Sequence, residues 1–361
     1  MGPEIENRAA RVHTDVSNTV ELRNLYRLFG KTTAIADINF GITSGSVFGY
    51  IGPNGAGKTT SMRILATLDL PTYGDAFVDG FSVVNDPELV RRRLGFMPDW
   101  FGTYRDVSCE EYLDFFARAY GLMGRDRSRR LKWVMDFTGT IGMRDKPIGG
   151  LSKGMKQRIC LGRAMIHDPK VMILDEPAAG LDPRARIDLR RMIRELADRG
   201  KTIMISSHIL TELAEVCDTV GIIEQGHILA VGSVEDIREG RGARAETNPV
   251  PAQDGGQVPS VRTPATATRV LRLRIARDAE LAATWLSGEP VQGRVAFSQP
   301  SWIGEVIVDG QMVRCEFEGD LDQQVQLIRE LVQVGFMLAE CGLDEKSLED
   351  VFLQVTEGLV Q

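Results

Sequence analysis

The 361-residue chain has few cysteines and no long hydrophobic run. Its cysteines are scattered, odd in number and without paired metal spacing, so we expect reduced thiols in a cytosolic protein rather than a disulfide framework. They are Cys109, Cys160, Cys217, Cys315 and Cys341. No apolar stretch approaches the roughly 18 to 20 residues that cross a bilayer. The polar, charged start also lacks the apolar core of a secretory signal.

The chain also has no excess of basic over acidic residues. Lys and Arg total 43 against 50 Asp and Glu, which leaves a formal net charge of −7. Proteins that bind nucleic acid in general usually have a basic face. We therefore expect no nucleic-acid partner, although this balance does not exclude a local basic patch.

Length and composition together predict two domains. Residues 1–18 predict a loose N-terminal tail. Residues 19–239 alternate short apolar runs with helical patterns, which is typical of an α/β domain. Residues 240–268 are rich in Gly, Ala, Pro, Arg and Thr. They contain too little apolar surface to offset the entropy of ordering, so we expect a flexible linker.

Residues 269–361 predict a small α+β domain. Apolar and charged residues alternate through Leu271–Ile275, a helix pattern follows over 278–286, and Asp309-Gly310 is a hairpin signal between two short strands. A second helix over 325–332 and a closing strand over 336–341 complete the order βαββαβ. This order predicts a ferredoxin-like sandwich.

The strongest local signal is a glycine-rich loop between a predicted buried strand, Val47–Ile51, and a predicted helix, Thr59–Leu65. Its glycines let backbone N–H groups and the positive helix end surround a phosphate. We expect Lys58 to reach the β- and γ-phosphates of a triphosphate, and the hydroxyl of Thr59 to bind Mg²⁺. The loop consists of Gly52, Pro53, Asn54, Gly55, Ala56, Gly57, Lys58 and Thr59, and Thr60 is expected at the α-phosphate. The alternative is a glycine-rich turn that matches by chance.

A second buried strand, Val171–Leu174, ends in two acids. Acids at the carboxyl end of a strand lie where open α/β sheets bind ligands. We expect Asp175 to hold Mg²⁺ directly or through water, and Glu176 to orient or deprotonate the attacking water. The alternative makes both acids surface charges that cap the next turn.

A third apolar run, Thr202–Ser207, is followed by His208. An imidazole at this strand end could donate a hydrogen bond to the γ-phosphate and respond to its loss. Taken alone, a histidine after a strand is more often a structural residue.

Between the loop and the acidic strand lies Leu151-Ser152-Lys153-Gly154-Met155-Lys156-Gln157-Arg158. Ser152 and Gly154 precede a predicted helix over 155–166, which makes them a second anion-binding helix end, or simply a capped N-terminus. This ordered set of segments resembles the ATP-binding subunits of ABC transporters over residues 20–235.

The resemblance implies a P-loop NTPase domain of the ABC type with a helical subdomain at about 100–165. It implies ATP and Mg²⁺ as cofactors, and a homodimer in which Ser152 and Gly154 serve the ATP of the second copy. It also implies ATP hydrolysis that drives a separate integral-membrane permease, so the chain is expected in the cytoplasm, peripheral on the inner face of the cell membrane. Phe29 matches the aromatic that stacks on adenine, although core packing is the alternative.

Two positions depart from the family pattern. Lys153 and Met155 stand where glycine and glutamine are usual, but the serine and the second glycine of the anion site are kept. Asp99 follows Pro98 where a glutamine is usual. As a hard oxygen ligand it could reach Mg²⁺, yet it adds negative charge near the γ-phosphate, so metal contact and no contact both stay open.

The helical subdomain and the C-terminal segment carry the remaining indications about the membrane partner. By resemblance, the helical subdomain (109–116 helical, 125–132 basic) receives the coupling element of the permease, although an ordinary solvated face is the alternative. Residues 343–353 resemble the tail of bacterial exporter-type ATPases, whereas importer subunits tend to carry a β-barrel domain. A last helix is expected from Ser347, with an apolar stripe of Leu348, Val351, Phe352 and Val355.

Three hypotheses follow. The first is the ATP-hydrolysing subunit of a membrane exporter. The second is a soluble ABC-type ATPase associated with ribosomes or DNA, which usually has two such domains or a long coiled coil. The third is a scaffolding module that binds ATP without turnover, which the presence of Glu176 and His208 disfavours. The transported substrate lies outside this sequence.

Overall fold

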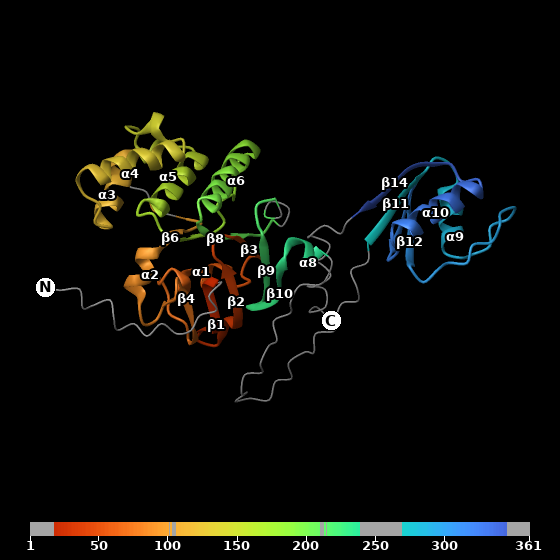
Figure 1. The fold of residues 1–361 in the computed structure, drawn as a ribbon, viewed down its shortest axis with the longest axis horizontal. Coiled ribbons are helices and arrows are strands. Elements are labelled where there is room, and N and C mark those ends of the chain that lie inside the picture. Colours follow the sequence, from red (N-terminus) through yellow and green to blue (C-terminus); the bar gives the residue numbers. More distant parts are fainter. Residues whose placement is uncertain are drawn as a thin grey trace. The chain divides into compact units, whose positions relative to one another are not determined.

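The computed structural model describes residues 18–100, 102, 106–209, 213, 215–238 and 269–344. The chain divides into two compact units, one that extends to Val234 and one that contains residues 269–344 (Figure 1). Apart from Asn18, which begins the first strand, the expected tail lies outside the described residues, as do the expected linker and the expected last helix. The predicted domain boundaries stay predictions.

The first unit contains a four-stranded antiparallel sheet in the order β2-β1-β4-β5. Alternate residues of its long strands turn apolar side chains to one buried face, among them Leu22 of β1 and Phe40 of β2. The strands are β1 (Asn18–Phe29), β2 (Thr32–Thr43), β4 (Tyr73–Val78) and β5 (Phe81–Ser82).

A six-stranded sheet in the order β10-β9-β3-β8-β7-β6 forms the centre of this unit. All its neighbours are parallel except β10, which is antiparallel to β9. The strands are β3 (Val47–Ile51), β6 (Leu94–Met97), β7 (Val171–Leu174), β8 (Thr202–Ser207), β9 (Thr219–Glu224) and β10 (His227–Ser233). The predicted strands β3, β7 and β8 are confirmed and lie side by side, so their carboxyl ends meet at one edge.

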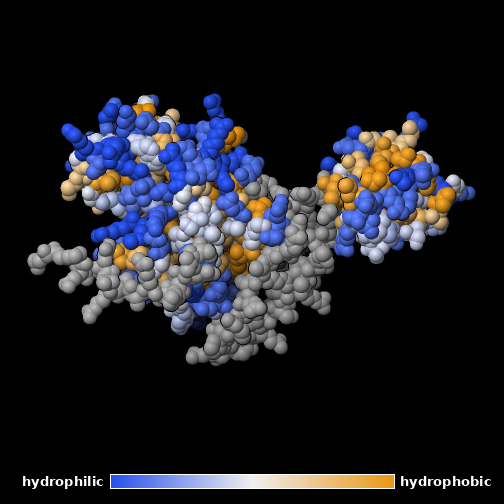
Figure 2. All heavy atoms as spheres, in the orientation of Figure 1, coloured by the Kyte–Doolittle hydropathy of each residue, from blue (hydrophilic) through white to orange (hydrophobic). Residues whose placement is uncertain are grey.

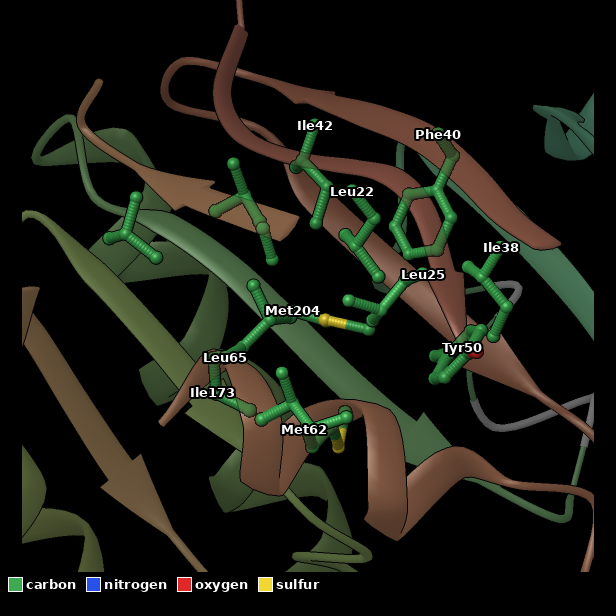
Figure 3. Close-up of a cluster of buried hydrophobic side chains, with 14 of the residues drawn as sticks. Leu22, Leu25, Ile38, Phe40, Ile42, Tyr50, Met62, Leu65, Ile173 and Met204 are labelled. Carbon is green, nitrogen blue, oxygen red and sulfur yellow. The ribbon is translucent and has the colours of Figure 1, made fainter. Parts of the chain in front are cut away.

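Helix α1 (Lys58–Leu65) packs in the apolar core that the two sheets share. Figure 3 shows Met62 and Leu65 of this helix among side chains from both sheets, including Leu25 of β1, Ile173 of β7 and Met204 of β8. Burial of this apolar cluster positions the start of α1 against the ends of β3 and β7.

The remaining helices of the unit are α2 (Pro87–Arg93), α3 (Cys109–Ala119), α4 (Gly124–Phe137), α5 (Lys153–Met165) and α6 (Pro183–Asp198), with short 3₁₀ turns at Ile141–Met143 and Ile148–Gly150. The short helix α8 (Val234–Arg238) begins at Val234, and its other residues are assigned to the second unit. Helices α3, α4 and α5 fall in the span predicted for the helical subdomain. Ser108 and Glu111 form a capping box that starts α3. The predicted start of α5 at Met155 was wrong by two residues, because Ser152 caps the helix and Lys153 is its first residue.

The second unit is a four-stranded antiparallel sheet in the order β12-β13-β11-β14. Its elements are β11 (Arg269–Ile275), α9 (Ala279–Leu286), β12 (Ile303–Asp309), β13 (Met312–Phe317), α10 (Leu321–Gln333) and β14 (Leu338–Asp344). This is the predicted βαββαβ order with ferredoxin-like strand neighbours. Gly310 turns the predicted hairpin at a φ of +59°. The closing strand begins at Leu338, two residues after its predicted start.

No helix in the described parts of the chain has the length and apolar character to cross a membrane. All five cysteines are unpaired; Cys341 is half-buried and the others are buried.

A half-buried histidine, His167, links the helical subdomain to the central sheet. The His167 ring stacks on Tyr120, with ring centroids 3.7 Å apart, and its Nε2 lies 3.2 Å from the carbonyl oxygen of Leu94 at the start of β6. Burial lowers the pKa of His167 to about 4, and the positive charges of Arg130 and Lys201 act in the same direction. The folded protein therefore favours the neutral ring.

This burial predicts acid sensitivity. The pKa of His167 in the folded protein lies below the unfolded value of about 6.5. Its contribution to the free energy of unfolding is therefore fully present above about pH 6.5 and is lost as the pH falls toward 4. Between pH 7 and 4.5 the His167 contribution is about 2.5 kcal/mol. We expect His167→Gln to be less stable at pH 7 but to lose that much less unfolding free energy over the same interval, measured by urea titration at both pH values. Equal pH dependence in both proteins would contradict the assignment.

Candidate active site

The glycine-rich loop owes its shape to two positions that exclude a side chain. Gly57 precedes α1 at a φ of +107°, and a Cβ there would lie 2.7 Å from the carbonyl oxygen of Ala34. A Cβ on Gly52 would collide with the carbonyl oxygen of Ile223. With these glycines the loop turns tightly into α1, so the N-terminal N–H groups of α1 are available to an anion.

Lys58 lies inside this loop. Its Nζ donates hydrogen bonds to the carbonyl oxygens of Gly52 at 2.6 Å and Pro53 at 3.1 Å, and lies 3.5 Å from Glu176 Oε1. Burial lowers the pKa of the Lys58 ammonium, while the charges of Glu176 and Asp175 oppose that shift. The amine is therefore held where the loop and the acidic strand meet, as a phosphate-binding lysine requires.

A buried hydroxyl joins the two acids. Ser206 Oγ, at the end of β8, donates to Asp175 Oδ1 at 2.7 Å and accepts the backbone N–H of Glu176 at 2.8 Å. Burial raises the pKa of the Asp175 carboxyl; hydrogen bonds from Ser206 and Thr59 oppose the rise, and the charges of Glu176 and Asp99 add to it. The structure thus brings Thr59 and Asp175, the predicted metal ligands, into contact.

Glu176 and His208 also meet, and the alternative of two unrelated surface acids does not fit this packing. Glu176 has a φ of +46°, so its side chain leaves β7 in another direction from that of Asp175. His208 Nδ1 lies 2.8 Å from Glu176 Oε2; because a carboxylate only accepts, Nδ1 carries the proton. If the ring carries only that proton, Nε2 is an acceptor, so the predicted donation to a γ-phosphate needs a second proton on the ring or a turned ring.

One acceptor of this group has no hydrogen bond. Glu176 Oε1 is buried, and no described residue donates to it within hydrogen-bond length. Its nearest cation is the Lys58 ammonium, whose Nζ lies 3.5 Å away as an ion pair. A water or a nucleotide-bound ligand could supply the closer hydrogen bond that this buried oxygen lacks.

The donors fit a magnesium nucleotide better than a bare metal ion. Among the described residues no group of three or more His, Cys, Asp and Glu could hold a metal. Mg²⁺ in nucleotide sites needs only one or two protein oxygens besides the phosphates. The Thr59 hydroxyl and the Asp175 carboxylate offer these two.

Asp99 is exposed and lies two residues beyond Met97, whose carbonyl oxygen accepts the N–H of Asp175 at 2.8 Å. After burial and the charge of Glu176, the negative charge of Asp99 also favours a raised pKa of the Asp175 carboxyl. Asp99 therefore lies at the edge of the site, and its contact with a metal stays a prediction.

Phe29 ends β1 with 49% of its surface exposed, so the core-packing alternative does not fit. The guanidinium of Arg27 lies 4.5 Å from the ring centroid and is held by Asp69 at 2.7 Å. One face of the ring is thus covered by a cation, which leaves the other for a flat ligand.

Ser152 and Gly154 form a separate site. Ser152 is exposed and its Oγ accepts the N–H of Met155 at 3.3 Å, which caps α5. Gly154 faces Leu181 and Ala185, near the start of α6. In the described chain no hydrogen bond or ion pair joins Ser152 or Gly154 to Lys58, Glu176 or His208.

Two contributors escaped sequence analysis. Ser206 lay within a predicted strand but was assigned no role, although a hydroxyl at the end of an apolar run beside the acidic strand was a usable signal. Arg27 gave no comparable signal, because its position over Phe29 depends on the twist of β1.

The fold and the site define a P-loop nucleotide-binding domain, and comparison with known proteins identifies its family. Residues 35–179 match the family model described as ABC transporter. The sequence is 39% identical to the ABC transporter ATP-binding protein NatA of Bacillus subtilis over 210 residues, which cover 57% of this chain and 84% of that protein. It is 36% identical to the Nod factor export ATP-binding protein I of Sinorhizobium fredii, over 63% of this chain and 66% of that one.

Other matches differ in coverage. The chain is 32% identical to the probable multidrug ABC transporter ATP-binding protein YbhF of Escherichia coli over 62% of its length, but the match spans only 39% of that protein. A solved ATP-binding subunit of an ABC transporter superposes with a TM-score of 0.57 at 31% identity, covering 63% of this chain and 95% of that one. The cbiO1 subunit of Clostridium perfringens, part of the cbiONQ complex, gives 0.55 at 26% identity, with 61% and 90% covered.

The chain therefore belongs to the ATP-binding subunits of ABC transporters, and its N-terminal unit is an ABC-type ATPase domain. The predicted P-loop fold class is confirmed. The roles of the individual site residues stay predictions.

The contacts of Ser206 predict a positioning role. Ser206→Ala removes the donor to Asp175 and the acceptor of Glu176 N–H, so we expect kcat for ATP hydrolysis to fall about 10- to 100-fold while the affinity for ATP without Mg²⁺ changes little. Ser207→Ala is the matched control, because the neighbouring Ser207 hydroxyl accepts only the N–H of Ile209 among its described contacts. Equal kcat losses in both variants would contradict the assignment.

Proposed function

We propose that this chain is the ATP-hydrolysing subunit of an export-type ABC transporter, that two copies close head to tail around two ATP, and that a separate membrane permease is their partner. One observation carries the proposal. Lys58, Asp175, Glu176 and His208 converge at the ends of three adjacent parallel strands, joined by hydrogen bonds and an ion pair, while Ser152 stays apart and exposed.

The residues divide the chemistry among them. Lys58 binds the β- and γ-phosphates, and the N–H groups before α1 surround them. Bound Mg²⁺ would neutralise charge on the phosphates, held by Thr59 and Asp175. Glu176 accepts a proton from the attacking water at Oε1, and His208 orients the Glu176 carboxylate from Oε2.

The head-to-tail dimer follows from what one copy lacks. A helix N-terminus with an exposed serine is an anion site, but in the described part of the chain no hydrogen bond or ion pair joins Ser152 to the glycine-rich loop. A second copy can present Ser152 and Gly154 to the γ-phosphate bound by Lys58. Gly154 faces Leu181 and Ala185. The segment Ala179-Gly180-Leu181-Asp182 resembles the loop through which two such domains touch, so we place it at the same interface.

Export and the permease are supported by the relatives. One relative is named for Nod factor export and another, from Bacillus subtilis, for linearmycin resistance, and YbhF is a probable multidrug ABC transporter ATP-binding protein. We propose the corresponding place for this chain, at the cytoplasmic face of a membrane through its permease. The soluble alternative is not favoured, because none of these relatives is named as a ribosome or DNA protein.

The role of Glu176 predicts a loss of turnover without a loss of binding. Glu176→Gln keeps the shape of the side chain but removes the base, so ATP hydrolysis should fall at least about 100-fold while ATP still binds. Glu195→Gln is the control, since Glu195 pairs with Arg199 on the surface of α6. Turnover that survives Glu176→Gln would leave the assignment of the base wrong, and no turnover in the unaltered chain would favour the scaffold hypothesis.

The dimer predicts a sensitivity at Ser152. In the Glu176→Gln background with ATP and Mg²⁺, light scattering should report a dimer, and Ser152→Arg should return it to a monomer because the large cation fills the anion site. Ser108→Arg is the control for a lost helix cap, since Ser108 caps α3. A strictly monomeric ATP-bound form, or an unaffected Ser152→Arg dimer, would contradict the proposal.

The partner is tested by co-expression. A neighbouring reading frame with several apolar spans of roughly 20 residues should co-purify with this chain in detergent and stimulate its ATP hydrolysis. Co-purification with ribosomes in place of such a protein would favour the soluble alternative.

A further inference from the structure

Helix α10 has apolar residues on two separate faces. Leu327 and Leu331 point into the core of the C-terminal unit and are fully buried. A second row is exposed: Leu321 (73%), Val325 (47%) and Val332 (54%), with half-buried Ile328 between them. Figure 2 shows hydrophobic side chains on the visible face of this unit.

The exposed row has the spacing of a helix-packing seam. Its members are separated by four, three and four residues, which places them in one stripe along a helix of 3.6 residues per turn. Single exposed apolar residues are ordinary, but an aligned row of four is typical of a covered surface. The 4-3-4 spacing is the one that a partner helix fills with interlocking side chains.

The neighbours of the stripe show which side of α10 it occupies. On one flank Gln324 reaches β14, with its Nε2 3.8 Å from Cys341 Sγ. On the other flank Gln326, Glu330 and Gln333 line a cleft of about 550 Å³ formed with Trp302. The stripe therefore lies on the side of α10 that borders β14, the edge strand of the sheet.

We propose that residues 347–355 form a helix that packs on this stripe. The chain leaves β14 at Asp344, and 17 residues follow in the sequence, all outside the described part. Only two residues stand between Asp344 and Ser347, so the three Cα-to-Cα steps give a reach of about 10 Å. The predicted helix brings its own apolar stripe, which consists of Leu348, Val351, Phe352 and Val355.

The direction of the chain fits this packing. Helix α10 is followed by a short connection and then β14, and the contact of Gln324 with Cys341 shows that the two run antiparallel. The end of β14 therefore lies near the start of α10. A helix that begins there runs alongside α10 in the same direction, with Leu348 near Val325 and Val355 near Val332.

A second copy of the chain is a poorer occupant. The stripe spans about 16 Å of helix and offers four aliphatic side chains. Two such stripes bury far less than the roughly 1,200 Å² that stable protein interfaces need. A tethered segment needs less area, because its effective concentration at the stripe is high.

Hydrogen exchange on the full-length protein tests the packing. We expect the amides of 348–355 to exchange at least about tenfold faster in the double variant Val325→Asp/Val332→Asp than in the unaltered chain. Gln326→Asp adds a charge to the same helix outside the stripe and is the matched control. Fast exchange of 348–355 in the unaltered chain, or equal rates in all three proteins, would overturn the proposal.

A cross-link identifies the occupant. With Cys341→Ser as background, Val325→Cys and Leu348→Cys should form a disulfide within one chain under copper phenanthroline, whereas Gln326→Cys with Leu348→Cys should not. A disulfide between two chains, together with a dimer in solution that Val325→Asp dissociates, would assign the stripe to a second copy instead.

Discussion

The arrangement of the candidate site depends on one hydroxyl. Ser206 bridges the side chain of Asp175 and the backbone of Glu176, and so ties the end of β7 to the end of β8. Both acids are mostly buried, and burial raises the pKa of Asp175 toward the neutral form. Hydrogen bonds to the charged form counter that tendency. Because Asp175 and Glu176 bring negative charge into a buried environment, the hydroxyl donor of Ser206 is needed there as well as the ammonium of Lys58.

The sheets explain why this contact forms. The apolar cluster between them holds α1 in place. The parallel register pairs Leu174 of β7 with Ile205 of β8, so Asp175 and Ser206 follow at the same level. Backbone hydrogen bonds align the ends of the parallel strands. Residues far apart in the chain that follow those ends, such as Lys58 and Glu176, therefore lie close together in the folded protein. The positions of the site residues therefore depend on the apolar packing of Leu25, Met62 and their neighbours.

Much of this could be predicted from sequence, and the failures have physical reasons. Buried strands such as Val171–Leu174 are short uninterrupted apolar runs, and the alternation in Leu271–Ile275 marks a half-exposed strand, so both were found. The start of α5 was misjudged because a side-chain cap, not periodicity, fixes a helix end. The roles of Ser206 and Arg27 could not be ranked, since each depends on which strand or ring lies beside it in space.

The shielding of Phe29 has a consequence for nucleotide choice. An aromatic ring recognises the flat surface of a base and ignores the groups along its rim. With the Arg27 guanidinium over one side, only the other face of Phe29 could serve the purine that we predict to stack there. Stacking on it cannot by itself separate adenine from guanine, so a preference for ATP over GTP has to come from other contacts or from the relative abundance of the two nucleotides in the cell.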